Sequence, residues 1–135
     1  MKNLLIIYEK SLRYRKIYLG VSILLAIIIL LISITPYSKI KEVGYPEISD
    51  IFDMINHFIG FCIFNFFLIS TFLSYKSKNS FSSKYILLYL SIAIFWGAVC
   101  ETSQLFNPTR KFQFIDIIAN TSPPFIILYI FRKLL

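Results

Sequence analysis

Apolar residues fill this chain in four long runs that short polar stretches separate. The first run extends without a charged residue over about 17–35, and the others cover about 54–75, 85–104 and 114–131. A helix of about 20 apolar residues crosses the ~30 Å hydrocarbon core of a bilayer. The pattern therefore predicts an all-α membrane protein, a bundle of four transmembrane helices that forms a single domain over residues 1–135.

The ends and connections of the runs carry further signals. Residues 1–16 place basic residues among apolar ones at helical spacing, which is typical of either an amphipathic helix on the membrane surface or a partly disordered basic tail. We expect loops over 36–52, 76–84 and 105–113. Pro123-Pro124 removes two backbone donors from the fourth run, so we expect a kink there that faces the bundle interior.

The composition indicates a membrane protein, and the distribution of charged residues predicts how it is oriented in the membrane. Of the residues, 57% are hydrophobic, against about 45–50% in soluble domains. The net charge is +7, with 14 Lys and Arg in all. Most of these basic residues lie in the N-terminal segment, the 76–84 turn and the C-terminus. Because the charge is sorted by position, we expect no nucleic-acid partner, and the positive-inside rule places both termini in the cytoplasm.

Polar residues interrupt the second, third and fourth runs near the ends that this topology turns outward. Their pairs stand three or four positions apart, so each pair shares a helix face. Ionisable residues near hydrocarbon are costly and usually functional. The candidate ligand-binding residues are Asp53, Asn56, His57, Glu101, Gln104, Arg110, Asp116 and Asn120. We further expect Gly60 and Gly97 to let helices approach closely beneath these pairs.

Some of these residues also have structural interpretations. Asp116 fits an N-terminal helix cap, Asn120 fits a hydrogen bond between helices, and His57, the only histidine, fits a hydrogen-bonded core residue. The acids and His57 match no zinc spacing, so we expect no metal, and no phosphate loop or nucleophile elbow indicates a cofactor. Cys62 and Cys100 lack a CxxC spacing and are best interpreted as small core residues.

The same residues resemble the signature of VanZ-like membrane proteins. Residues 53–58, followed by Phe61, are similar to the family segment D-K-x-x-H-F-x-x-Y, with Met54 and Phe61 in place of Lys and Tyr. Residues 101–121 resemble E-x-x-Q-x-F-x-x-x-R-x-F-x-x-x-D-x-x-x-N-T, and Pro123 stands where the family usually has Gly.

The resemblance implies a small multi-pass protein of the bacterial cytoplasmic membrane. The family takes its name from a protein linked to low-level resistance to the glycopeptide teicoplanin, and most members have no known molecular activity. The resemblance therefore extends more readily to the fold, the membrane location and the site positions than to antibiotic resistance.

Three functions remain open at this point. The first is an outward polar pocket that binds an envelope component, such as a lipid-linked saccharide, a glycopeptide or a partner membrane protein, in addition to membrane lipids. In the second, the chain is an intramembrane hydrolase or transferase with His57 or Glu101 as general base. In the third, it is a structural subunit of a larger membrane complex. The residues favour a protein that is not an enzyme.

Overall fold

The described residues, which in this computed structural model are 2–35, 46–74, 83–106 and 114–134, are almost all helical. Side chains are described for 14–35, 54–74, 83–106 and 114–134. The helices are α1 (Lys2–Ile34), α2 (Pro46–Ser74), α3 (Ser83–Gln104), α4 (Phe114–Thr121) and α5 (Pro123–Leu134). The described segments contain no strand.

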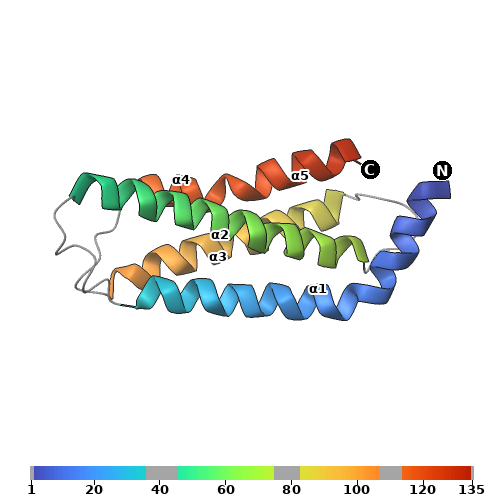
Figure 1. The fold of residues 1–135 in the computed structure, drawn as a ribbon, viewed down its shortest axis with the longest axis horizontal. Coiled ribbons are helices and arrows are strands. Elements are labelled where there is room, and N and C mark those ends of the chain that lie inside the picture. Colours follow the sequence, from blue (N-terminus) through green and yellow to red (C-terminus); the bar gives the residue numbers. More distant parts are fainter. Residues whose placement is uncertain (1, 36–45, 75–82, 107–113, 135) are drawn as a thin grey trace.

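Four segments are long and apolar enough to cross a membrane, as the hydropathy pattern predicts. They are Tyr14–Ile34, Met54–Ser74, Ser83–Gln104 and Phe114–Leu134, the last of which combines α4 and α5. The helices run alternately up and down, so both termini lie at the same end of the bundle (Figure 1). The all-helical fold and the four candidate spans are thus confirmed, while the side of the membrane that each end faces stays a prediction.

Two helices begin earlier than the runs of apolar residues suggest. α2 begins at Pro46, so the loop expected over 36–52 is wrong for its last seven residues. Proline favours the first turn of a helix, where its missing N–H is not needed, and no helix breaker follows it. α1 begins at Lys2 and continues into the first span, with its first turns inclined to the rest (Figure 1). Of the two alternatives for residues 1–16, the structure has the helix.

The fourth span is interrupted where its prolines stand. α4 ends at Thr121 and α5 begins at Pro123, with Ser122 between the two helices. Pro123 and Pro124 are both buried, as expected for a break that faces the interior. The hydroxyl of Tyr89, itself fully buried, donates to the carbonyl of Pro124 at 3.2 Å, so α3 contacts the backbone just beyond the break.

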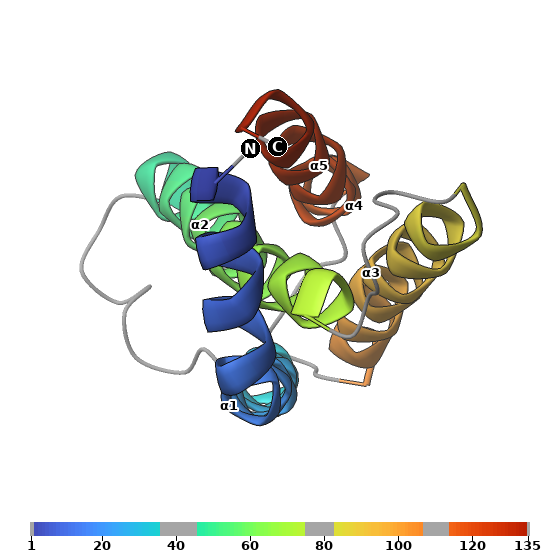
Figure 2. The same ribbon diagram turned by 90° about the vertical axis from the view of Figure 1, so that its right-hand side faces the viewer.

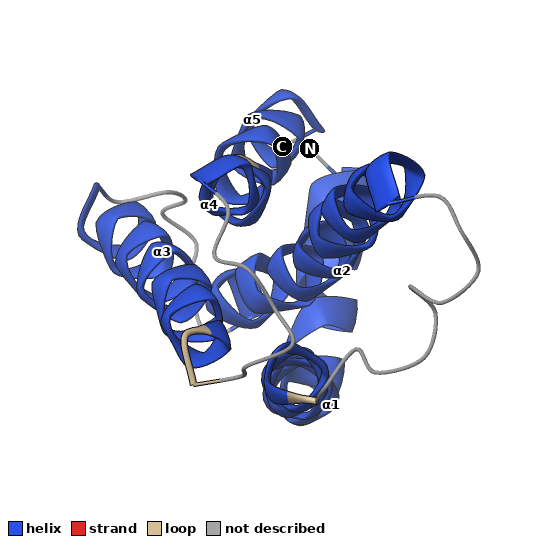
Figure 3. Cartoon of the chain, turned by 90° about the vertical axis from the view of Figure 1, so that its left-hand side faces the viewer, coloured by secondary structure: helices blue, strands red, loops and turns tan. Residues whose placement is uncertain are grey.

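α2 is the central helix of the bundle, and α1 is the most peripheral. α2 packs against all the other helices, whereas α1 packs against α2 and α3. Views along the bundle show α1 to one side and α4–α5 to the other (Figures 2 and 3). The core consists mainly of α2 and α3 side chains with one from α5, namely Phe61, Phe64, Leu68, Ile69, Tyr89, Ala93, Cys100 and Leu128. Large apolar side chains also cover the outside, as a lipid-facing surface requires.

Candidate functional site

Side chains from three helices meet in one hydrogen-bonded network at the end of the bundle away from the termini. His57 of α2 joins Asn120 of α4 through Nδ1 and Oδ1 at 3.2 Å. Asn120 Nδ2 donates to Glu101 Oε2 of α3 at 3.2 Å. Gln104 Nε2, one turn along α3, donates to the same carboxylate oxygen at 3.3 Å. We call these four residues the polar network.

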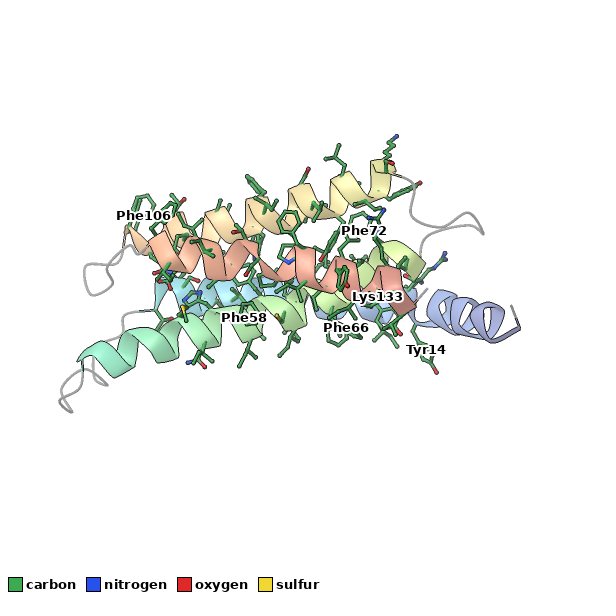
Figure 4. All side chains as sticks on the ribbon, turned by 90° about the horizontal axis from the view of Figure 1, so that it is seen from above. Tyr14, Phe58, Phe66, Phe72, Phe106 and Lys133 are labelled. Carbon is green, nitrogen blue, oxygen red and sulfur yellow. The ribbon has the colours of Figure 1, made fainter. Side chains whose placement is uncertain are left out.

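The network is almost completely enclosed by the helices. Asn120 is 0% exposed, and Glu101 and Gln104 are each 2% exposed. His57 is half-buried, so it forms the accessible edge of the network. Figure 4 shows the same end of the bundle, with Phe58 and Phe106 labelled there and Tyr14 and Lys133 labelled at the other end. Burial in an apolar bundle strengthens each of these hydrogen bonds and makes a missing partner costly.

The amide group of Asn120 fixes the direction of its two hydrogen bonds. Its NH₂ group points toward Glu101, whose Oε2 accepts the hydrogen bond. Its Oδ1 then faces His57 and needs a donor, so the imidazole carries a proton on Nδ1. In the neutral ring, Nε2 holds the lone pair. Glu101 thus sets the tautomer of His57 through one amide group.

Gly97 lies where α3 and α4 pack against each other. An ideal Cβ at Gly97 would lie 3.4 Å from Asn120 Cβ and 3.7 Å from a ring carbon of Phe61. α3 and α4 therefore come together directly beneath the network, as predicted for this glycine. The matching expectation for Gly60 is wrong, since a Cβ at that position would meet nothing within 4 Å. This absence of a contact at Gly60 holds for the residues that the structure describes.

The remaining predicted residues fall into different environments. Asp116 is 5% exposed and lies in the first turn of α4, one turn before Asn120. It is inside the helix rather than at its cap, and a carboxylate in a first turn is favoured by the helix dipole. Asn56 is exposed on α2 and is not part of the polar network. The side chain of Asp53 and all of Arg110 lie outside the described residues, so their roles stay predictions.

The structure adds buried polar residues that the sequence interpretation did not select. Asn65, fully buried on α2, donates from Nδ2 to the carbonyl of Phe61 at 2.8 Å. Its Oδ1 is buried without a hydrogen-bond partner within the described segments. Asn65 stands eight positions after His57, so both lie on one face of α2. That spacing was the only signal that links Asn65 to the site.

Ser22 and Thr71 form a second buried polar contact, which connects α1 with α2. The two hydroxyl oxygens are 3.3 Å apart, and each hydroxyl also bonds to a carbonyl one turn earlier on its own helix. Cys62 and Cys100 are free thiols. In the side chains that the structure describes, no three His, Cys, Asp or Glu residues are grouped so that they would hold a metal ion.

Comparisons of the chain with models of known protein families, with curated proteins and with solved structures find no match. What the site does is therefore inferred from its own residues. It presents a neutral or protonated imidazole at its edge, backed by an amide and a carboxylate on two other helices. Such a set of donors and acceptors suits recognition of hydroxyl, amide or ammonium groups.

Proposed function

We propose that this chain is a VanZ-like protein of the bacterial cytoplasmic membrane that binds a polar part of an envelope component at its outward end. Both termini lie in the cytoplasm in this proposal. The ligand is a lipid-linked saccharide, a glycopeptide or a partner membrane protein. The observation that carries the proposal is the polar network, in which His57, Asn120, Glu101 and Gln104 connect three helices at one end of the bundle.

The cost of the network argues for a role beyond packing. Each polar side chain in an apolar span lowers the free energy gained on insertion, and helices in membranes pack well through small residues alone. Packing of this kind is already present at Gly97. Through Asn120, the carboxylate of Glu101 sets which nitrogen of the half-buried imidazole carries the proton. A packing contact alone does not require such an arrangement.

The link with glycopeptide resistance depends on the family resemblance and is part of the same proposal. Glycopeptides carry an ammonium group, amides and many hydroxyls, which are groups that the imidazole at the accessible edge of the network can bind. Expression of the chain in a susceptible bacterium should then raise the teicoplanin concentration needed to stop growth. An unchanged concentration with the protein present in the membrane would remove this part of the proposal.

Binding is tested with the full chain in lipid nanodiscs. The probes are teicoplanin and a polyprenyl-linked disaccharide, each titrated separately against the protein. Glu101→Gln keeps the shape of the side chain but removes the charge, and His57→Gln removes the imidazole. We expect each change to weaken binding about tenfold or more, because hydrogen bonds to charged groups contribute about 1.5–3 kcal/mol.

Thr102→Val is the matched control for Glu101→Gln. Thr102 is the next residue on α3, is exposed, and bonds only to the carbonyl of Ala98 among the interactions described for it. Binding should survive this change. If instead Glu101→Gln lowers the unfolding temperature and leaves both affinities unchanged, the network is structural and the chain is better interpreted as a subunit of a larger complex.

One observation favours a catalytic alternative, in which the chain hydrolyses or transfers a lipid-linked substrate. The proton on Nδ1 leaves Nε2 of neutral His57 as a base at the edge of the network. The connection from His57 to Glu101 through a single amide keeps the two groups within ~10 Å, the range that one bridging group allows. Product release from the lipid-linked disaccharide, abolished by His57→Gln, would support an enzyme, and a tight complex without turnover would support a binder.

A further inference from the structure

An apolar groove lies at the end of the bundle opposite to the polar network. Three side chains of α2, three of α3 and Leu128 of α5 line this groove, which has a volume of about 20 Å³. Among them are Ile69 and Leu73 of α2 and Tyr85 and Ile86 of α3. We call this the lower groove. Figure 2 faces this end of the bundle and shows the near ends of α2, α3 and α5 there.

The groove is apolar along its length, and it is shallow rather than closed. Its lining is aliphatic and aromatic, with Tyr85 about half exposed at the mouth. A volume of about 20 Å³ admits little more than one water-sized group. A headgroup therefore does not fit inside it. The apolar lining suits a hydrocarbon chain that lies against the groove rather than inside it.

Basic residues stand close in the sequence to residues that line the lower groove. Lys84 precedes Tyr85 at the start of α3, and Arg132 follows Leu128 by one turn, on the same face of α5. Both are exposed. Lys133 lies 4.9 Å from the ring centre of Tyr129 and is the third basic residue at this end of α3 and α5. The described side chains at this end of α3 and α5 include no acid.

We propose that the lower groove and these basic residues form a binding site for one anionic phospholipid. The phosphate of the headgroup lies between Lys84 and Arg132, and one acyl chain lies along the groove. Two matches of chemistry support this occupant: basic residues for an anionic group and an apolar groove for a hydrocarbon chain. Basic sites between transmembrane helices at the cytoplasmic leaflet bind anionic lipids in this way. The site is independent of the polar network.

The test measures which lipid contacts the groove in the folded protein. Trp96, the only tryptophan, is changed to Phe, which loses no hydrogen bond because its Nε1 has no partner within the described residues. A tryptophan is then placed at the mouth by Tyr85→Trp. The protein is reconstituted in phosphatidylcholine vesicles, and its fluorescence is quenched with either brominated phosphatidylglycerol or brominated phosphatidylcholine. We expect phosphatidylglycerol to be preferred about fivefold or more at this position.

Two controls distinguish a site from a general attraction of anionic lipid. Leu87→Trp puts the reporter on the lipid-facing side of the same helix, where Leu87 is 67% exposed, and should show little preference. The pair Lys84→Gln and Arg132→Gln should bring the preference at residue 85 close to one. The pair Arg15→Gln and Lys16→Gln removes the same charge from α1 at the same end of the bundle and should leave the preference intact.

Salt gives an independent measurement that needs no substitution of the basic residues. At about 1 M salt the screening length falls to about 3 Å, so the preference at residue 85 should fall while quenching by phosphatidylcholine persists. Equal quenching by the two lipids at residue 85 would overturn the proposal. So would a preference that survives Lys84→Gln with Arg132→Gln, or one that is equally strong at residue 87.

Discussion

Asn120 occupies the position where the helices of the site depend on one another. Its single amide accepts from His57 and donates to Glu101, and its backbone packs against Gly97. A side chain with only acceptors, or only donors, cannot meet both demands. The identity of this residue is thus determined by its neighbours on two other helices.

Asn120→Asp should remove the hydrogen bond that Asn120 donates to Glu101. The new carboxylate has the same shape but places an acceptor against the acceptor of Glu101, so we expect the free energy of unfolding to fall by about 3 kcal/mol. Adding Glu101→Gln provides an NH₂ donor for the new carboxylate and should recover most of the loss. Unfolding of the single and double variants in detergent measures the coupling. If the double variant loses as much free energy of unfolding as the two single variants together, the two side chains do not interact.

The sequence allowed the members of the site to be predicted, but not the bonds between them. His57, Glu101 and Asn120 were recognisable because ionisable and amide residues are rare in apolar runs. That Asn120 bridges the other two depends on the depth and rotation of α4, which the spacing of residues along one helix does not define. For the same reason Gly97 could be predicted to lie at a contact while Gly60, with equal sequence support, lies at none.

At the scale of helices, hydropathy located the spans and missed where two helices begin. A span of the bilayer needs about 20 apolar residues, and the apolar run of the second span begins near Met54. The helix itself begins at Pro46, because the backbone hydrogen bonds of a helix form in polar as well as in apolar sequence. Helix ends outside the hydrocarbon are set by local backbone chemistry, on which the hydropathy pattern carries no information.

The break between α4 and α5 provides a prediction at this scale. Changing both Pro123 and Pro124 to Ala restores two N–H donors and removes the ring clashes, so the fourth span should straighten. Spin labels at Ile115 and Ile130, both exposed, in a cysteine-free background should move apart toward the ~22 Å of a straight helix of this length. We also expect a lower unfolding temperature, because Asn120 would be displaced from its partners.

The control for this experiment is Pro46→Ala. Pro46 is also a proline at the start of a helix, but it lies far along the chain from the spin labels and interrupts no span. The distance between the labels should not change in this variant. An unchanged distance in the Pro123 and Pro124 variant as well would show that packing by α2 and α3, rather than the prolines, imposes the break.

At the scale of the whole molecule, the up-and-down arrangement puts both termini at one end (Figure 1). This end carries the basic residues of α5 and of the start of α3, and the polar network lies toward the other end. In the topology that we propose from the positive-inside rule, the network faces outward. The direction follows from charge alone, because the fold itself is compatible with either orientation.

Accessibility labelling measures the orientation directly. Single cysteines replace Lys78 or Arg110 in a chain whose natural cysteines are changed to Ala. A thiol reagent that does not cross the membrane should label the residue 110 variant in intact cells and the residue 78 variant only after lysis. Labelling of both from the same side would contradict the proposed topology, and with it the outward position of the ligand site.

The unequal enclosure of the spans has a consequence for how the protein is made. The most apolar stretch of α1 has a mean hydropathy of 3.0 and is 11% buried, whereas that of Phe114–Leu134 has a mean hydropathy of 1.6 and is 39% buried. α1 therefore partitions into lipid by its own composition, soon after it leaves the ribosome. The last segment carries Asp116 and Asn120 and a broken backbone, so its entry depends on α2 and α3 already being in place with their partners. We therefore expect α1 to insert into the membrane by itself and Phe114–Leu134 to insert only together with the helices that it packs against.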